Sequence, residues 1–366
     1  MNKCTAIFLS LLSSVAILHA QSRVQPQKGI DQGYEVKSTE MMGGYNSPAR
    51  IDIDGSWDTY VTGSFLYWNA RTNGFPIGVT HPQRNAVVPP FAVFPNPDGQ
   101  VLDLKFDYEP GFKVGFGIDF QNDNWTVFAE YVRLKVLDNT HTFAPQPSGW
   151  ILPSFFRTDN IGFADEVTMT WKMNYNVVNL EIGRPCYVGR FLIFKPHFGA
   201  QGNHIKESLQ NIAVIGTAAG TLRVLRSLTT QDAWAVGLRA GLDTKWLLGL
   251  GIRLFGDIAT NLLYTDYTVR QKQSDATSED LFSTAYAVKN ELSTIQPNLE
   301  IGLGFGWGTY IGQNKWHVDL SAGYDFIVYW NHNMMSHTMA EFVRTQSQSI
   351  PSLFMHGLTA TGRLDF

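Results

Sequence analysis

The stretch LEIGLGFGWG, Leu299 to Gly308, fits two different structures. Its Gly-x-Gly-x-Gly core resembles a loop that cradles a phosphate group, whereas its strict alternation is typical of a β-strand. A phosphate-binding loop leads into the N-terminus of a helix, whose backbone N–H groups bind the anion. The segment that follows, TYIGQNKW, instead indicates a turn and a second strand. We therefore interpret the stretch as a strand with large apolar side chains on one face and Gly or Glu on the other.

The same alternation recurs from Asp58 to the end of the chain. It is clearest in 112–120, 125–137, 167–183, 191–201, 234–254, 316–330 and 358–366. Between Val177 and Val178 the apolar phase changes, which predicts a β-bulge because a slip of one residue exchanges the two faces of a strand. These segments indicate about ten strands, an even number as bacterial outer-membrane barrels have. Strand-like residues in 86–94 and 221–230 leave twelve strands open.

Two kinds of connection separate the expected strands. Short turns are expected near 121–124, 184–189, 244–247 and 309–315, and long polar stretches near 70–104, 138–165, 204–231, 271–292 and 332–350. Short turns at one end and long loops at the other are typical of outer-membrane barrels. The predicted fold class is therefore all-β: a transmembrane, antiparallel up-and-down β-barrel of about 10–12 strands, with short periplasmic turns and long extracellular loops.

The composition agrees with this interpretation. Charged residues make up 16% of the 366 residues, against about 25% in soluble proteins, and aromatic residues make up 13%. The net charge of −4 without long charged runs gives no support to nucleic acid as a partner. A soluble sandwich also alternates, but Trp residues near strand ends favour a barrel with aromatic girdles. The expected membrane-interface aromatics are Trp125, Trp171, Trp234, Trp307, Trp316 and Trp330.

The N-terminus predicts export to the bacterial outer membrane. Lys3 precedes a short apolar run from Ala6 to Leu18, and Ala20 suits a cleavage point. We predict a signal peptide at 1–20, a flexible lead segment at 21–57 and the outer-membrane β-barrel at 58–366.

The chain has two cysteines, Cys4 and Cys186. Cys4 would leave with the signal peptide. Cys186 is then either a free thiol or one half of an intermolecular disulfide.

Several segments resemble the Legionella-type major outer membrane porin family, which also occurs in environmental chlamydiae. They are GSFLYWNARTNGF (63–75), GFKVGFGIDFQNDNWTVFAEYVRL (111–134), NYNVVNLEIGR (174–184), LIFKPHFGAQGNHI (192–205), AVGLRAGLDTKWLLGLGIRLFGDIATNLLY (235–264) and HVDLSAGYDFIVYWNHN (317–333). The resemblance covers residues 59–366 and implies a pore-forming outer-membrane barrel with no catalytic residue. Cys-rich relatives are linked by disulfides into envelope networks, and this chain departs from them because only Cys186 is available.

The inward phase of the strands predicts a lumen lined by charges of both signs. The expected pore-lining residues are Lys113, Asp119, Lys172, Lys195, His197, Arg239, Asp243, Arg253, Glu300, Asp319, Asp325, Arg363 and Asp365. A porin-like barrel would let small hydrophilic solutes diffuse through this lumen, with a selectivity set by these charges. The alternative is a closed structural or adhesive barrel that presents its long loops to host or envelope partners. About ten strands is near the size at which side chains fill a barrel, so both hypotheses stand.

No enzyme, metal or cofactor is predicted. The chain lacks a Gly-x-Ser-x-Gly motif, and His332 and His337 have no carboxylate or Cys partners at metal-binding spacing. The expected partners are outer-membrane lipids, small hydrophilic solutes and the barrel-assembly machinery. Phe366 closes an alternating last strand and resembles the C-terminal assembly signal of such barrels. The sequence leaves open whether the barrel forms a homo-oligomer.

Overall fold

The computed structural model describes residues 51, 53, 58–81, 99–120, 124–145, 149–156, 163–188, 191–216, 222–277, 283–343 and 350–366. The chain divides into two units, Met1–Met41 and Met42–Phe366, and all of the described residues belong to the second unit. The predicted signal peptide and Cys4 lie outside the described residues, as does the lead segment apart from residues 51 and 53.

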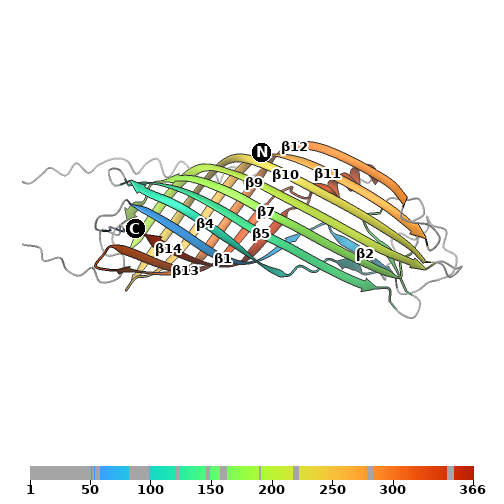
Figure 1. The fold of residues 1–366 in the computed structure, drawn as a ribbon, viewed down its shortest axis with the longest axis horizontal. Helices are drawn as coiled ribbons and strands as arrows, with labels where there is room; N and C mark the ends of the chain where they lie inside the picture. The colour runs from blue at the N-terminus through green and yellow to red at the C-terminus, as the bar shows by residue number, and fades with distance from the viewer. Residues whose placement is uncertain are drawn as a thin grey trace, which may run out of the picture. The chain divides into compact units, whose positions relative to one another are not determined.

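Ten antiparallel strands of the described chain form a closed barrel, which confirms the predicted fold class. Each strand pairs with the next barrel strand in the sequence, and the first pairs with the last, as an up-and-down barrel requires. The strands lie side by side and run obliquely around the barrel (Figure 1). They are β1 (Thr59–Thr72), β4 (Tyr108–Phe120), β5 (Trp125–Phe143), β7 (Glu166–Gly183), β9 (Leu192–Gly216), β10 (Leu222–Gly249), β11 (Ile252–Thr277), β12 (Ser283–Ile311), β13 (Trp316–Tyr329) and β14 (Leu353–Asp365).

Smaller elements lie in the connections. Strand β8 (Cys186–Val188) pairs with the start of β9, and β3 (Val101–Asp103), β2 (Pro76–His81) and β6 (Trp150–Pro153) form a separate three-stranded sheet. Helix α2 (Met334–Val343) follows β13. In the described ranges, no helix has the length and apolar character needed to cross a membrane.

The two ends of the barrel differ in their connections. Short turns join strands at 249–251 and 312–315, at the end where β1 begins and β14 finishes, and the turn predicted at 121–124 lies outside the described residues apart from Asn124. By the pattern of outer-membrane barrels this is the periplasmic end. At the other end β10, β11 and β12 extend to 28, 26 and 29 residues, whereas β13 has 14 (Figure 1). The polar stretches near 204–231 and 271–292 are therefore mostly strand, and the turn predicted at 244–247 lies instead at 249–251.

Strand β7 shows how the barrel wall changes along its length. Odd-numbered residues face inward from Val167 to Gly183, and the pairing with β5 and β9 has no register shift. The predicted bulge at Val177–Val178 is therefore wrong. The apolar residues change sides because the surroundings change: outward residues are apolar from Val178 to Ile182 and polar from Thr168 to Asn176. We call the apolar outer band the belt and take it as the membrane-spanning zone.

Beyond the belt the interior of the barrel holds an apolar core. Trp68, Trp171, Tyr175 and Tyr329 are fully buried there, together with Met334 and Met335 at the start of α2. Outward residues on the same strand segments are mostly polar, so this part of the wall faces water outside and a packed core inside. Within the belt the polarity is reversed, with apolar residues outside and polar residues inside.

The opening stretch is a regular part of β12. Leu303, Phe305 and Trp307 are exposed on the belt, and Gly302 to Gly308 face inward at every second position. Close approach of β13 requires glycine at Gly304, because an added Cβ would lie 2.4 Å from the carbonyl oxygen of Ala322. The strand interpretation of this stretch is confirmed.

Candidate functional site: the barrel lumen

A cavity of about 300 Å³ lies inside the barrel at the level of the belt. The charges that line it are balanced, with basic and acidic side chains in equal number. The basic residues are Lys113, Lys195, Arg239, Lys245, Arg253 and Arg363; the acidic residues are Glu130, Glu181, Asp243, Asp257, Glu300 and Asp325. His197 also lines the cavity. Each strand places every second side chain on the lumen face. Because a ten-stranded barrel is narrow, charges from different parts of the wall come within contact distance.

Arg239 on β10 connects two acidic groups from other strands. Its Nε lies 2.6 Å from Oε1 of Glu181 on β7, and its Nη1 lies 2.9 Å from Oε2 of Glu300 on β12. Gln201 donates to Glu300 over 3.0 Å. The Arg239 side chain is 8% exposed, so removing it would leave carboxylates poorly compensated in a confined space, which typically costs 3–5 kcal/mol.

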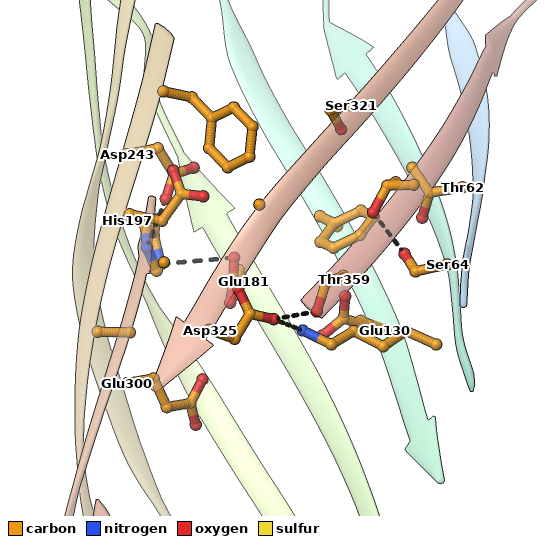
Figure 2. A pocket seen from close by; sticks show the side chains of 18 of the residues that line it. Thr62, Ser64, Glu130, Glu181, His197, Asp243, Glu300, Ser321, Asp325 and Thr359 are labelled. Atoms are coloured by element: carbon orange, nitrogen blue, oxygen red, sulfur yellow. Dashed lines mark hydrogen bonds and ion pairs between the residues drawn. The ribbon is translucent and has the colours of Figure 1, made fainter. Parts of the chain in front are cut away.

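His197 on β9 lies beside this group (Figure 2). Its Nδ1 is 3.5 Å from Glu181, and its Nε2 is 3.3 Å from Oδ1 of Asp243. Lys195 reaches the other oxygen of Asp243 over 3.7 Å. Glu181 therefore contacts both Arg239 and His197, and one continuous network links β7, β9, β10 and β12.

A second group occupies a different part of the wall (Figure 2). Lys113 on β4 donates to Oδ2 of Asp325 on β13 over 3.0 Å, and the hydroxyl of Thr359 donates to the same oxygen over 2.7 Å. The hydroxyls of Ser64 and Thr361 lie 2.8 Å apart. This group connects strands on both sides of the seam between β1 and β14.

The periplasmic end of the lumen holds its own ion pairs. Arg253 forms a bidentate pair with Asp319, in which Nη2 lies 2.6 Å from Oδ1. Arg363 donates from Nε to Asp365 over 2.8 Å and stacks 3.6 Å above the ring of Tyr60. Arg363 also lies 3.4 Å from Asp119, which lines a smaller cavity of about 100 Å³. Planar guanidinium groups suit such bidentate and stacked contacts better than lysine does.

Lys245 and Asp257 differ from the other lumen charges. Within the ranges that the structure describes, neither Lys245 nor Asp257 forms an ion pair, although both line the larger cavity; Glu130 lacks one too, but it accepts a hydrogen bond from Asn179 over 3.3 Å. Lys245 is paired across the strands with Phe255, and Asp257 lies opposite Asp243. These two ionisable side chains face the cavity itself.

The cavity ends at a packed layer on its extracellular side. The hydroxyls of Tyr175 on β7 and Tyr329 on β13 lie 3.0 Å apart, although these strands are on opposite sides of the barrel. After β13 the chain turns inward, so that His332, Met334 and Met335 are buried among side chains of the long strands. We call residues 332–343 the plug. Together with the two tyrosines, the plug closes the extracellular end of the lumen in this conformation.

A polar contact holds the plug in the apolar core. His332 donates from Nε2 to Glu207 over 2.9 Å, and its Nδ1 accepts from Gln296 over 3.1 Å. The backbone N–H of Met334 donates to the side-chain oxygen of Gln231 over 2.9 Å. The side chains of His332 and Glu207 are each 1% exposed. A buried pair of this kind is stable only while both members are present.

The predicted pore-lining residues face the interior with one exception. Those that face inward are Lys113, Asp119, Lys195, His197, Arg239, Asp243, Arg253, Glu300, Asp319, Asp325, Arg363 and Asp365. Lys172 is exposed on the outer face, so the inward placement predicted for it is wrong. The prediction for Lys172 fails for the same reason as the predicted bulge. Beyond the belt, the outer face of β7 is polar and faces water.

Four charged lumen residues were missed. Lys245 falls in the turn predicted at 244–247, and Asp257 lies where the alternation of β11 is less regular. Glu130 and Glu181 lie in recognised strands and on the polar phase, so their position alone could have identified them.

The predicted interface aromatics are exposed on the outer face at Trp125, Trp234, Trp307, Trp316 and Trp330. Trp171 is wrong, because it is fully buried and donates from Nε1 to Glu207 over 3.2 Å.

Two further predictions concern single residues. Cys186 is an exposed free thiol, and its predicted pairing with another molecule stays a prediction. Phe366 donates its backbone N–H to Thr59 over 3.0 Å at the seam, and its role as an assembly signal also stays a prediction. Among the described side chains, no three His, Cys, Asp or Glu gather in a way that would hold a metal ion.

Comparison with known proteins gives one family and several solved structures, including two outer-membrane proteins. The model of the Legionella pneumophila major outer membrane protein precursor family matches residues 53–365. No curated protein matches the chain. The outer membrane protease OmpT from Escherichia coli is similar at 10% identity over 87% of this chain and 99% of that chain, with a TM-score of 0.40. The outer-membrane expressed OmpT of Vibrio cholerae is similar at 9% identity over 85% and 99%, with a TM-score of 0.10. Neither likeness bears on what this chain does.

Proposed function

Because this chain belongs to the Legionella pneumophila major outer membrane protein family, and is an outer-membrane β-barrel, we propose that it is a porin-like barrel whose plug gates it. Small hydrophilic solutes would diffuse passively through the lumen when the plug moves. The barrel would bind no cofactor and turn over no substrate.

The observation that supports this proposal is the charged cavity at the level of the belt. Apolar side chains could fill a barrel of this size, and burying ion pairs in place of apolar residues brings little or no stability. Lys245 and Asp257 have no ionic partner among the described residues, so the lumen retains ionisable side chains that a solute or water can meet. A polar lumen of this kind suits the passage of hydrophilic solutes better than it stabilises the barrel.

The balance of charges predicts weak ion selectivity. Equal numbers of basic and acidic residues line the cavity, and most of them are paired across the wall. Selectivity in charged pores follows the sign of the lining residues. We expect a reversal potential near zero in a salt gradient.

A second function is favoured by the plug. The contact between Tyr175 and Tyr329 and the apolar core around Met334 and Met335 fill the extracellular half of the interior. A barrel that stays closed would act as a structural or adhesive protein, whose extracellular elements meet host or envelope partners. The two functions differ in one property, which is whether the plug moves.

Single-channel conductance in a planar lipid bilayer tests the proposal. The refolded full chain is compared with a variant in which a Gly-Ser linker replaces residues 334–343. We expect discrete ohmic steps from the natural chain, and a higher open probability from the variant. Silence from both proteins, each shown to be a folded barrel by its heat-modifiable migration, would reject the porin proposal and favour the closed barrel.

A further inference from the structure

Basic side chains gather on the outer face of β5, β7 and β9, directly beyond the belt. Arg133 and Lys135 project outward from β5, Lys172 from β7, and His204 and Lys206 from β9. We call these five residues the basic rim. Lys172, which the sequence pattern wrongly predicts to line the lumen, belongs to this surface.

The strand register places the basic rim in a compact area. Lys135 pairs with Asn174, and Asn174 pairs with Lys206, so one row across three strands has a cation at each end. Neighbouring strands are about 4.8 Å apart, which puts the backbones of Lys135 and Lys206 about 10 Å from each other. Lys172 lies one pleat further along the middle strand, next to Leu137. The three lysines can therefore reach a single anionic group.

The positive charge of the rim is only partly neutralised. Asp232 accepts from His204 over 2.8 Å and lies 3.5 Å from Lys206. On β5 and β7, the described side chains give no acidic partner to Arg133, Lys135 or Lys172. A cluster of like charges on adjacent strands is unfavourable unless an anion is bound.

The surface below the rim is apolar and continuous with it. Val178, Leu180 and Phe198 are 53%, 49% and 58% exposed on the same strands. The first rim residue, Arg133, is only two residues beyond Tyr131 of the belt, a step of about 7 Å along the strand. Acyl chains would contact the apolar part, and a headgroup would lie at the height of the cations.

We propose that the basic rim binds the phosphate groups of a phosphorylated glycolipid in the outer leaflet of the membrane. Charge complementarity supports this ligand, because clusters of Lys and Arg next to a membrane-spanning segment bind anionic headgroups. The apolar surface directly below favours a lipid over a soluble anion. The proposal does not depend on whether the barrel conducts solutes.

The barrel also offers a control surface. Arg270 and Lys272 project outward from β11, but they lie six and eight residues beyond Tyr264 of the belt, with Asp266 between. Lys172 is equally far along β7 from Val178 of the belt, so the control differs from the rim in its place on the wall and not in its distance from the belt. Arg270 is three strands, about 14 Å, from Lys172 in the same row of pairs. Neutralising these two cations changes the total charge as much as neutralising two rim lysines.

Binding of diphosphorylated lipid A to the full chain in neutral detergent micelles is measured by native mass spectrometry. The variants are K135Q/K172Q at the rim, the control R270Q/K272Q and the charge-preserving K135R/K172R. We expect about 30-fold weaker binding for K135Q/K172Q, since each cation near a lipid surface contributes about a factor of five. R270Q/K272Q and K135R/K172R should each remain within about threefold of the natural chain.

Two further ligands separate a lipid from a soluble anion. Fully dephosphorylated lipid A should bind weakly to the natural chain, and excess inorganic phosphate should fail to displace the phosphorylated lipid. The proposal is overturned by absence of lipid binding, by equal loss in both neutralised pairs, or by unchanged binding in K135Q/K172Q. It is also overturned if dephosphorylated lipid binds as well, or if inorganic phosphate competes fully. Heat-modifiable migration verifies that each variant is folded.

Discussion

Replacing His332 with Ala should release the plug. His332 is buried in the apolar core beyond the belt and donates a hydrogen bond to Glu207 over 2.9 Å. In the closed conformation, Ala at this position leaves the Glu207 carboxylate buried with one partner fewer. When the plug moves out, water reaches the same carboxylate, so the loss affects the closed conformation alone.

The size of the effect follows from the remaining partners of Glu207. Trp171 donates to Oε1 over 3.2 Å and Gln231 donates to Oε2 over 2.7 Å, so Glu207 is not left unpaired. The change therefore removes one hydrogen bond to a charged group, worth about 1.5–3 kcal/mol, and not the whole buried pair. The bond from Gln296 to Nδ1 is lost as well, but Gln296 still donates to the carbonyl oxygen of Trp330 over 3.2 Å, so it adds little. The ratio of open to closed barrels should rise about 10- to 150-fold.

Open probability in single-channel records measures this ratio directly. The matched control is His141→Ala, which removes a histidine 2.6 Å from Glu166 in a pair whose side chains are 44% and 36% exposed. A solvent-exposed pair contributes at most about 1 kcal/mol, and this one lies far from the plug in the sequence. The reasoning is refuted if H332A is folded and opens no more often than H141A.

Three other outcomes follow from single residues. Burial raises the pKa of Asp138, which lies beyond the belt, from 3.8 to about 6, so the folded state should lose stability as the pH rises from about 4 to 6. D138N should remove this loss and be about 1–2 kcal/mol more stable than the natural chain at pH 8 but not at pH 4, as measured by urea unfolding. Gly304→Ala should cost about 1–3 kcal/mol in the same assay, because its Cβ would meet Ala322, whereas Gly63→Ala, which meets nothing within 4 Å, should cost much less; equal costs would contradict the packing argument. Deleting Phe366 should reduce the amount of heat-modifiable barrel in the outer membrane, and normal assembly would count against an assembly signal there.

The alternation of the strands could be predicted from the sequence because each strand keeps one phase along its whole length. What the sequence pattern does not reveal is which face is inside. In β7 the apolar residues face inward at Met173 and outward at Leu180, since the outer surroundings change from water to lipid between them. If the outer surroundings are assumed to be the same along the whole strand, the same residues indicate a bulge. The errors at Lys172 and Trp171 share this cause.

For a related reason, the sequence pattern does not reveal the full length of the long strands. Residues such as Gln210, Ser208 and Thr230 are polar outward positions on β9 and β10, and high polarity is also the signal of a loop. Their inward neighbours, including Leu209 and Ala213, are buried and give the alternation of a half-buried strand. The plug was beyond prediction because its burial depends on residues from β9 to β12, which no local pattern connects.

The lumen was predicted in large part because charge within a belt strand has only one favourable direction. Arg239 and Glu300 face inward because an outward charge would lie in hydrocarbon. Their pairing across the lumen depends on the stagger of the closed barrel and could not be derived from the sequence. For the same reason the sequence does not predict the contact between Tyr175 and Tyr329 or the burial of the plug, which together close the lumen in this conformation.

The seam between β1 and β14 has a consequence for the biogenesis of the protein. Thirteen residue pairs, from Tyr60 with Asp365 to Thr72 with Leu353, join segments about 300 positions apart. Until the last strand has been translocated, the growing sheet keeps two unsatisfied edges, each able to recruit another chain. Closure therefore requires β14, and we predict that a periplasmic chaperone keeps the earlier strands apart from those of other copies until that strand arrives. A nonsense mutation just upstream of β14 should therefore yield an aggregating polypeptide rather than a smaller barrel.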